Sequence, residues 1–163
     1  MPLLLRAIRK NRWYTSDTIS WLPEGEIQAD PLGDLATGHN TLSVWQVEDD
    51  KSNLEQVITA LAANRDTISN LDYAIFDLDL LSTIGIRVEV NEGATPYERA
   101  NHWHRDLVEL TASKLVKLAQ VMLTNSNRER VLEKKILSLI KDAVQTGQID
   151  KARLNQKIAS KLT

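Results

Sequence analysis

The feature that most constrains the fold is the stretch of residues 95–124, TPYERANHWHRDLVELTASKLVKLAQVMLT. Thr95 is positioned to cap the first free amides of a helix, and Glu98, three residues later, can reach back to the cap. Pro96 would occupy the first helical position, where proline is favoured. At about 100° per residue the apolar side chains collect into one wide stripe. The stretch therefore predicts one long helix that contacts two neighbours, such as a sheet and another helix.

Four other segments have the apolar alternation or β-branched content of strands, namely residues 2–9, 41–47, 71–76 and 84–90. A capped helix at residues 53–63 separates the second segment from the third, which makes a βαβ unit with parallel strands possible. An antiparallel arrangement stays open. The fold class is therefore α+β, with a small, mostly antiparallel or mixed sheet of about four strands packed against the long helix.

Two further helices are expected at the C-terminal end. A capping box at Ser126 and Glu129 begins an amphipathic pattern that continues to about Val144, and Asp150 can cap a last helix. We therefore divide the chain into a core domain at residues 1–125 and a helical hairpin at residues 126–163, packed on the core or on a partner. The sequence of residues 10–41 predicts an ordered loop whose tryptophans, Trp13 and Trp21, pack on the core.

Composition indicates an ordinary globular chain. Its 163 residues are 42% hydrophobic and 26% charged, and they include no cysteine, which removes disulfides and thiol nucleophiles. No run of 18 apolar residues occurs, and Arg6 interrupts the opening leucines too soon for a signal peptide. We expect a cytoplasmic protein that does not enter a membrane.

The net charge of -2 conceals an asymmetry, because residues 126–163 carry nine Lys or Arg against four Asp or Glu. Solvation of these charges, or their packing against the acidic remainder, is the simplest interpretation. The sharper one is a nucleic-acid or acidic partner, for which the last helix would offer Lys151, Arg153, Lys157 and Lys161. Any such affinity should lie in residues 126–163 and weaken steeply with salt.

Motifs for catalysis are scarce. His102 and His104 would share a face in a strand, but in the predicted helix they point about 200° apart, so we expect no shared metal site. Asp77 and Asp79 follow a predicted strand and could in principle hold Mg²⁺. Phosphate-binding glycine loops and GxSxG are absent, and no cofactor is expected.

The predicted helix places His104 at the centre of the apolar stripe, where an imidazole needs a hydrogen-bond partner. One interpretation is a structural histidine bonded to a sheet carbonyl or an acidic side chain. The other is a pocket between helix and sheet lined by His104, Trp103, Asn101 and Tyr97. In both cases His104→Ala should cost about 1 to 3 kcal/mol, and His102→Ala no more than about 0.5 kcal/mol.

A non-catalytic interaction or regulatory protein is the function that these observations favour, because helix and core signals are good and no catalytic constellation appears. Two alternatives stay open, a metal-dependent hydrolase or nuclease using Asp77, Asp79 and His104, and nucleic-acid binding through the C-terminal helices. A protein partner or self-association as a homodimer is also expected, since the apolar stripes are wider than one sheet requires.

Overall fold

The computed structural model describes residues 2–13 and 20–162 of the chain. The elements in chain order are β1 (Leu3–Ile8), α1 (Lys10–Trp13), α2 (Asp30–Asp34), β2 (Leu42–Val47), α3 (Leu54–Ala63), β3 (Leu71–Asp77), α4 (Asp79–Thr83), β4 (Arg87–Val90), α5 (Glu98–Asn101), β5 (His104–Val108), α6 (Ala112–Thr124), β6 (Ser126–Val131), α7 (Glu133–Gln145), the 3₁₀ turn η1 (Lys151–Arg153), α8 (Gln156–Ala159) and the 3₁₀ turn η2 (Ser160–Leu162). Within these residues, no helix has the length and apolar character needed to cross a membrane.

The strands form one six-stranded sheet in the order β4-β5-β2-β1-β3-β6, and every neighbouring pair is antiparallel. Both β2 and β3 pair with β1, so they run parallel to each other with β1 between them. Helix α3 connects β2 to β3 and completes a split βαβ unit. The expected βαβ connection is therefore present, although its two parallel strands are not hydrogen-bonded neighbours.

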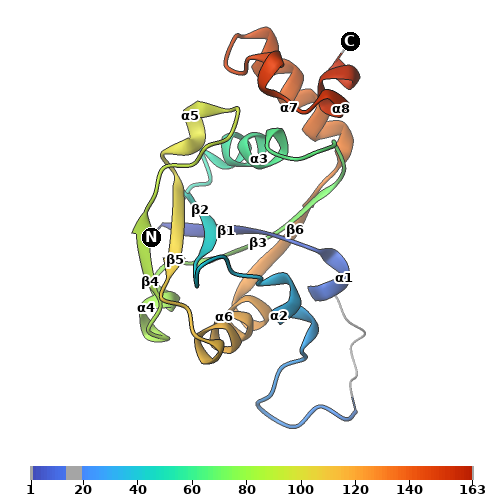
Figure 1. The fold of residues 1–163 in the computed structure, drawn as a ribbon. Coiled ribbons are helices and arrows are strands. Elements are labelled where there is room, and N and C mark those ends of the chain that lie inside the picture. Colours follow the sequence, from blue (N-terminus) through green and yellow to red (C-terminus); the bar gives the residue numbers. More distant parts are fainter. Residues whose placement is uncertain (1, 14–19, 163) are drawn as a thin grey trace.

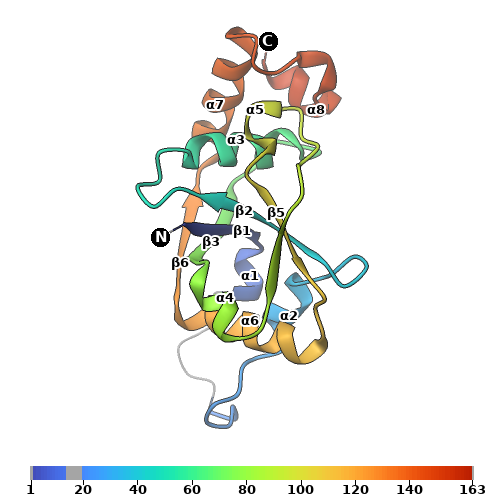
Figure 2. The ribbon, with the colours of Figure 1, turned by 90° about the vertical axis from the view of Figure 1, so that its left-hand side faces the viewer.

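Helices cover both faces of the sheet, in a layer arrangement that Figures 1 and 2 show from two sides. Leu5 and Tyr73 face the layer that contains α3, α5, α7 and α8. Leu4 and Phe76 face the layer that contains α1, α2, α4 and α6. Because successive side chains of a strand point to opposite faces, the apolar runs of β1 and β3 supply both cores at once.

The single long helix predicted for residues 95–124 is wrong. The stretch contains the one-turn helix α5, strand β5 and the 13-residue helix α6. Thr111 caps α6 by accepting a hydrogen bond from the Lys114 amide at 3.2 Å, whereas Thr95 caps nothing and is buried. Glu109 has a φ of 54°, which separates β5 from α6. The stripe was too wide for one helix because it combined residues of a strand and of two helices.

The estimate of about four strands is also wrong, because the sheet has six. The two that were missed are β5 and β6, and β6 occupies the residues predicted to begin a C-terminal helix. That helix, α7, begins at Glu133, and the expected last helix is divided among η1, α8 and η2. Asp150 does cap η1, accepting a hydrogen bond from Ala152 N at 2.9 Å.

The division of the chain at residue 125 stays a prediction. Strand β6, directly after this boundary, pairs with β3 along its whole length, and Ile136 of α7 lies in the same core as Leu5. Of the two tryptophans expected to pack on the core, Trp13 is buried, whereas Trp21 is 72% exposed. Residues 14–19, which lie between them in the chain, are outside the described residues.

Candidate functional site

The pairing of β1 with β2 stops at Leu5, which is opposite Trp45, although both strands continue beyond this pair. Beyond this pair, residues 6–8 of β1 pair only with β3, and residues 42–44 of β2 pair only with β5. A cavity of about 350 Å³ adjoins this opening, a volume within the range of small-molecule sites. Its lining residues are Arg6, Ala7, Ser43, Trp45, Leu61, Asn64, Glu92, Gly93, Ala94, Thr95 and His104. We call it the Arg6 cavity.

Arg6 is the first residue of β1 beyond the segment that pairs with β2, and its charge is poorly compensated. Nη1 donates to the Ser43 carbonyl at 2.8 Å, while Nε is shut off from solvent without an acceptor. Within the described residues no carboxylate oxygen lies within 4 Å of this guanidinium. Burial lowers the pKa of Arg6, and the Asp34 carboxylate opposes this shift from a distance. A guanidinium has five N–H donors, so most of its capacity is free for another acceptor.

Asp34 cannot supply that acceptor, because other donors already occupy its carboxylate. Oδ2 accepts hydrogen bonds from the Arg9 amide and from Trp13 Nε1, both at 2.7 Å. The Arg9 side chain adds an ion pair, with Nε 3.6 Å from Oδ1. The positive charge of Arg6 therefore has a distant counter-charge but no direct partner.

His104 forms part of the opposite wall. Its Nδ1 lies 2.7 Å from the Asn91 carbonyl oxygen, which can only accept, so Nδ1 carries the proton of this contact. Nε2 lies 3.9 Å from Asp106 Oδ1, and the ring meets Trp45 edge-on with centroids 5.2 Å apart. The ring is thus positioned by one hydrogen bond, through Nδ1, and by its edge contact with Trp45.

The segment of residues 92–95 closes the cavity and is held in place by Asn101. Asn101 Oδ1 accepts from the amide of Thr95 at 3.1 Å and from its hydroxyl at 2.7 Å, and Nδ2 donates to the Thr95 carbonyl. A Cβ added at Gly93 would lie 3.1 Å from Trp45 Cη2 and 3.2 Å from the His104 Cβ. A side chain at residue 93 would therefore require this wall, Trp45 or His104 to shift by a few tenths of an ångström.

The four residues predicted to share one pocket have different positions. His104 lines the Arg6 cavity, and the buried Asn101 supports its wall from behind. Tyr97 lines a second cavity of about 240 Å³ with residues of α3 and α7, and its hydroxyl donates to Gln148 Oε1 at 2.8 Å. Trp103 packs at the edge of the core on this face of the sheet. Only His104 and Asn101 therefore bear on the same cavity.

The carboxylates considered for a metal site lie far from His104. Asp77 ends β3 and Asp79 begins α4, whereas β5, which carries His104, is separated from β3 by β2 and β1. Three strand spacings of about 4.8 Å amount to about 14 Å, too far for ligands of one ion. No group of three or more metal-ligating side chains occurs in residues 2–13 and 20–162.

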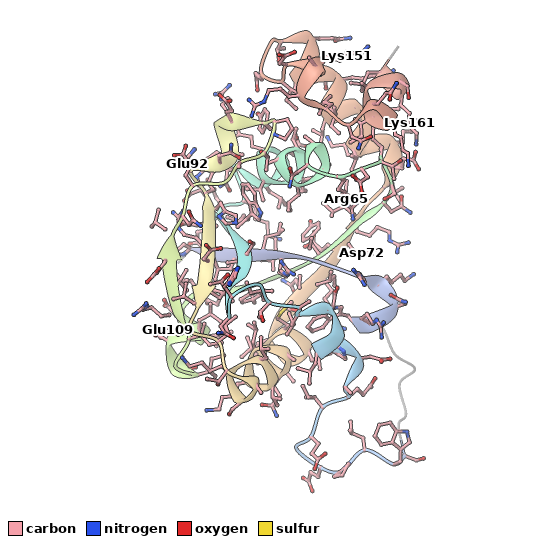
Figure 3. The ribbon with its side chains drawn as sticks, in the orientation of Figure 1. Arg65, Asp72, Glu92, Glu109, Lys151 and Lys161 are labelled. Carbon is pink, nitrogen blue, oxygen red and sulfur yellow. The ribbon has the colours of Figure 1, made fainter. Side chains whose placement is uncertain are left out.

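The C-terminal residues singled out for a basic surface are Lys151, Arg153, Lys157 and Lys161. Two of them have partners, since Arg153 pairs with Glu98 and Lys161 Nζ lies 2.8 Å from Glu133. The other two form no ion pair with any described residue. Figure 3 shows Lys151 and Lys161 on this segment. Nucleic-acid binding through this segment stays a prediction.

Sequence reasoning missed Arg6, which is now the most informative residue of the site. The signal was present, because an arginine between Leu5 and Ala7 interrupts an otherwise apolar strand. A charge in such a position is rare without a partner. The comparisons with known proteins add no relative, since no protein-family model, no curated protein and no solved structure matches this chain.

Proposed function

We propose that the chain is a non-catalytic binding protein whose ligand is a small organic anion held in the Arg6 cavity. The observation that carries this proposal is the half-buried Arg6 guanidinium, which has a single protein hydrogen bond and no carboxylate in contact. A buried charge without a partner is costly to the folded state. A carboxylate or phosphate group in the cavity would supply charge-assisted hydrogen bonds and offset that cost.

Binding without catalysis is supported by the positions of the nearby hydroxyl groups. Thr95 Oγ1 is committed to Asn101, and the described residues include no hydrogen bond between His104 and a hydroxyl group. A nucleophile activated by a general base needs such a contact. His104 instead serves as a wall of the cavity, with Nε2 facing Asp106 at 3.9 Å.

Calorimetric titration with a panel of small carboxylates and inorganic phosphate tests the proposal. At least one probe should bind the intact protein, and Arg6→Met should weaken that binding at least tenfold. Arg9→Met is the matched control, because the Arg9 side chain is 73% exposed and does not line the cavity. Equal affinity in the Arg6→Met protein, or failure of every probe that carries a carboxylate or phosphate group, zwitterions included, would remove the proposal.

A second pair of variants tests the shape of the cavity. Gly93→Ala should weaken binding several-fold, since the added methyl group would displace the wall against Trp45 and His104. Gly38→Ala is the control, because a Cβ at Gly38 meets no atom within 4 Å and its φ is not in the left-handed region. Equal affinities of the two variants would place the ligand elsewhere.

A further inference from the structure

A negatively charged side chain also lines the Arg6 cavity. Glu92 lines the cavity, is exposed, and makes no hydrogen bond or ion pair with any described residue. Figure 3 places it on the segment between β4 and α5. Arg6 lines the same cavity, yet the two side chains do not pair with each other. One cavity therefore holds two opposite charges, each of which lacks a direct partner.

This separation of charge bears on which anion the cavity would accept. A simple carboxylate near Arg6 would also experience repulsion from the Glu92 carboxylate, which lines the same cavity. A ligand that carries an ammonium group next to its carboxylate would turn this repulsion into attraction. Between the charged residues, the lining side chains of Ala7, Trp45 and Leu61 offer an apolar surface to the rest of such a ligand.

We infer that the ligand of the Arg6 cavity is a small zwitterion of the α-amino-acid class, with its carboxylate at Arg6, its ammonium group at Glu92 and an apolar side chain against Trp45 and Leu61. This inference rests on the proposed function and narrows its ligand class. The cavity volume of about 350 Å³ is near the small end of the range for ligand sites, which suits a single amino acid.

Three matched probes separate the contributions of the two charges. Leucine carries both groups, 4-methylpentanoate lacks the ammonium group, and 3-methylbutylamine lacks the carboxylate. By calorimetric titration of the intact chain, leucine should bind at least tenfold more tightly than 4-methylpentanoate, and 3-methylbutylamine should not bind measurably. Removing the carboxylate should reduce the affinity more than removing the ammonium group does, because Arg6 is more enclosed than Glu92.

The variant Glu92→Gln tests whether the preference for leucine over 4-methylpentanoate comes from Glu92. In this variant the affinity for leucine should fall to that for 4-methylpentanoate, while the affinity for 4-methylpentanoate stays equal or rises. Glu24→Gln is the control, because Glu24 is also exposed but does not line the cavity. Glu92 is exposed and without a protein partner, so its replacement should leave the fold intact.

The outcomes distinguish the inference from the proposed function. Equal binding of leucine and 4-methylpentanoate, with no effect of Glu92→Gln, would overturn the zwitterion and leave the anion site standing. Binding of 4-methylpentanoate alone would overturn it in the same way. If none of these probes and no member of the carboxylate and phosphate panel binds, both the inference and the proposed function fail.

Discussion

Two arginines on strands of the same sheet differ in how their charge is balanced. Arg130 on the edge strand β6 donates from Nε and Nη2 to the two oxygens of Asp72, at 2.9 and 3.0 Å. Arg6 on the central strand β1 donates once, to a backbone carbonyl. The first arrangement is a bidentate pair complete within the protein. The second is incomplete, and this difference is why we propose a structural role for Arg130 and a ligand-binding role for Arg6.

The polar residues next to Arg130 are also satisfied. The buried Tyr73 donates its hydroxyl to Glu129 Oε2 at 2.7 Å, and Lys51 Nζ lies 3.3 Å from Glu129 Oε1. The Tyr73 hydrogen bond, and then Lys51, hold the pKa of Glu129 below its ordinary value, with burial opposing them. The junction of β3 and β6 therefore contains polar groups that stabilise the fold, in contrast to the opening between β1 and β2.

The largest expected effect is at the complete pair. Asp72→Asn should lower the free energy of unfolding by about 2 to 3 kcal/mol, because it removes the two charge-assisted bonds between a buried carboxylate and Arg130. Urea unfolding at pH 7 measures this loss. Asp66→Asn, at an exposed position, should change the value by no more than about 0.5 kcal/mol. A loss below 1 kcal/mol at Asp72, on the order of a surface pair, would contradict its structural role.

His104→Ala should cost about 1 to 2 kcal/mol, within the range predicted from the sequence, because the Asn91 carbonyl loses its partner and Trp45 loses an edge contact. His102→Ala should stay within about 0.5 kcal/mol, since His102 is exposed and its ring lies against that of its neighbour Trp103, with centroids 4.1 Å apart. The same urea titrations compare the two variants. Similar small losses would indicate that the Arg6 cavity has a less rigid wall than the structure shows.

Tyr73→Phe should cost about 1 kcal/mol at neutral pH, because Glu129 loses one hydrogen bond but keeps Lys51. Burial, and then Glu129, raise the pKa of Tyr73, so the folded state holds the phenol proton more tightly than the unfolded state does. This stabilisation is complete below the ordinary tyrosine pKa of about 10 and is lost as the pH rises above it. The stability difference between wild type and Tyr73→Phe should therefore shrink above about pH 10. A difference that stays constant from pH 8 to 11 would contradict the linkage.

The smallest effect on stability, and the sharpest test of the comparison, is expected at Arg6. Arg6→Met should leave the free energy of unfolding of the ligand-free protein unchanged or raise it by up to about 1 kcal/mol, since it replaces an uncompensated charge with an apolar chain. Arg130→Met should instead lower it by about 2 kcal/mol, because Asp72 loses both of its hydrogen bonds from this guanidinium. Paired urea titrations measure both variants, and losses of equal size would end the distinction between the two arginines.

Local sequence determined several elements of this protein. The predicted helix at residues 53–63 is α3 (Leu54–Ala63), and the strands predicted at 41–47 and 71–76 are β2 and β3 within one residue of each boundary. These elements have an apolar spacing that is read within one short window, although the N-cap of α3, Asn53, makes no side-chain capping bond. The end of α7 just before Gly147, whose φ is 71°, followed from the same kind of local signal.

Only the tertiary structure decided the remainder, because the missing information lies between distant segments. Strand β5 carries polar residues at three of its five positions, and its hydrogen bonds come from β2, about sixty residues earlier, and from β4. The Arg6 cavity likewise depends on where the β1–β2 ladder ends and on the wall held by Asn101. Periodicity within one segment contains neither the register of a neighbouring strand nor the partner of a buried charge, and these two properties define the site.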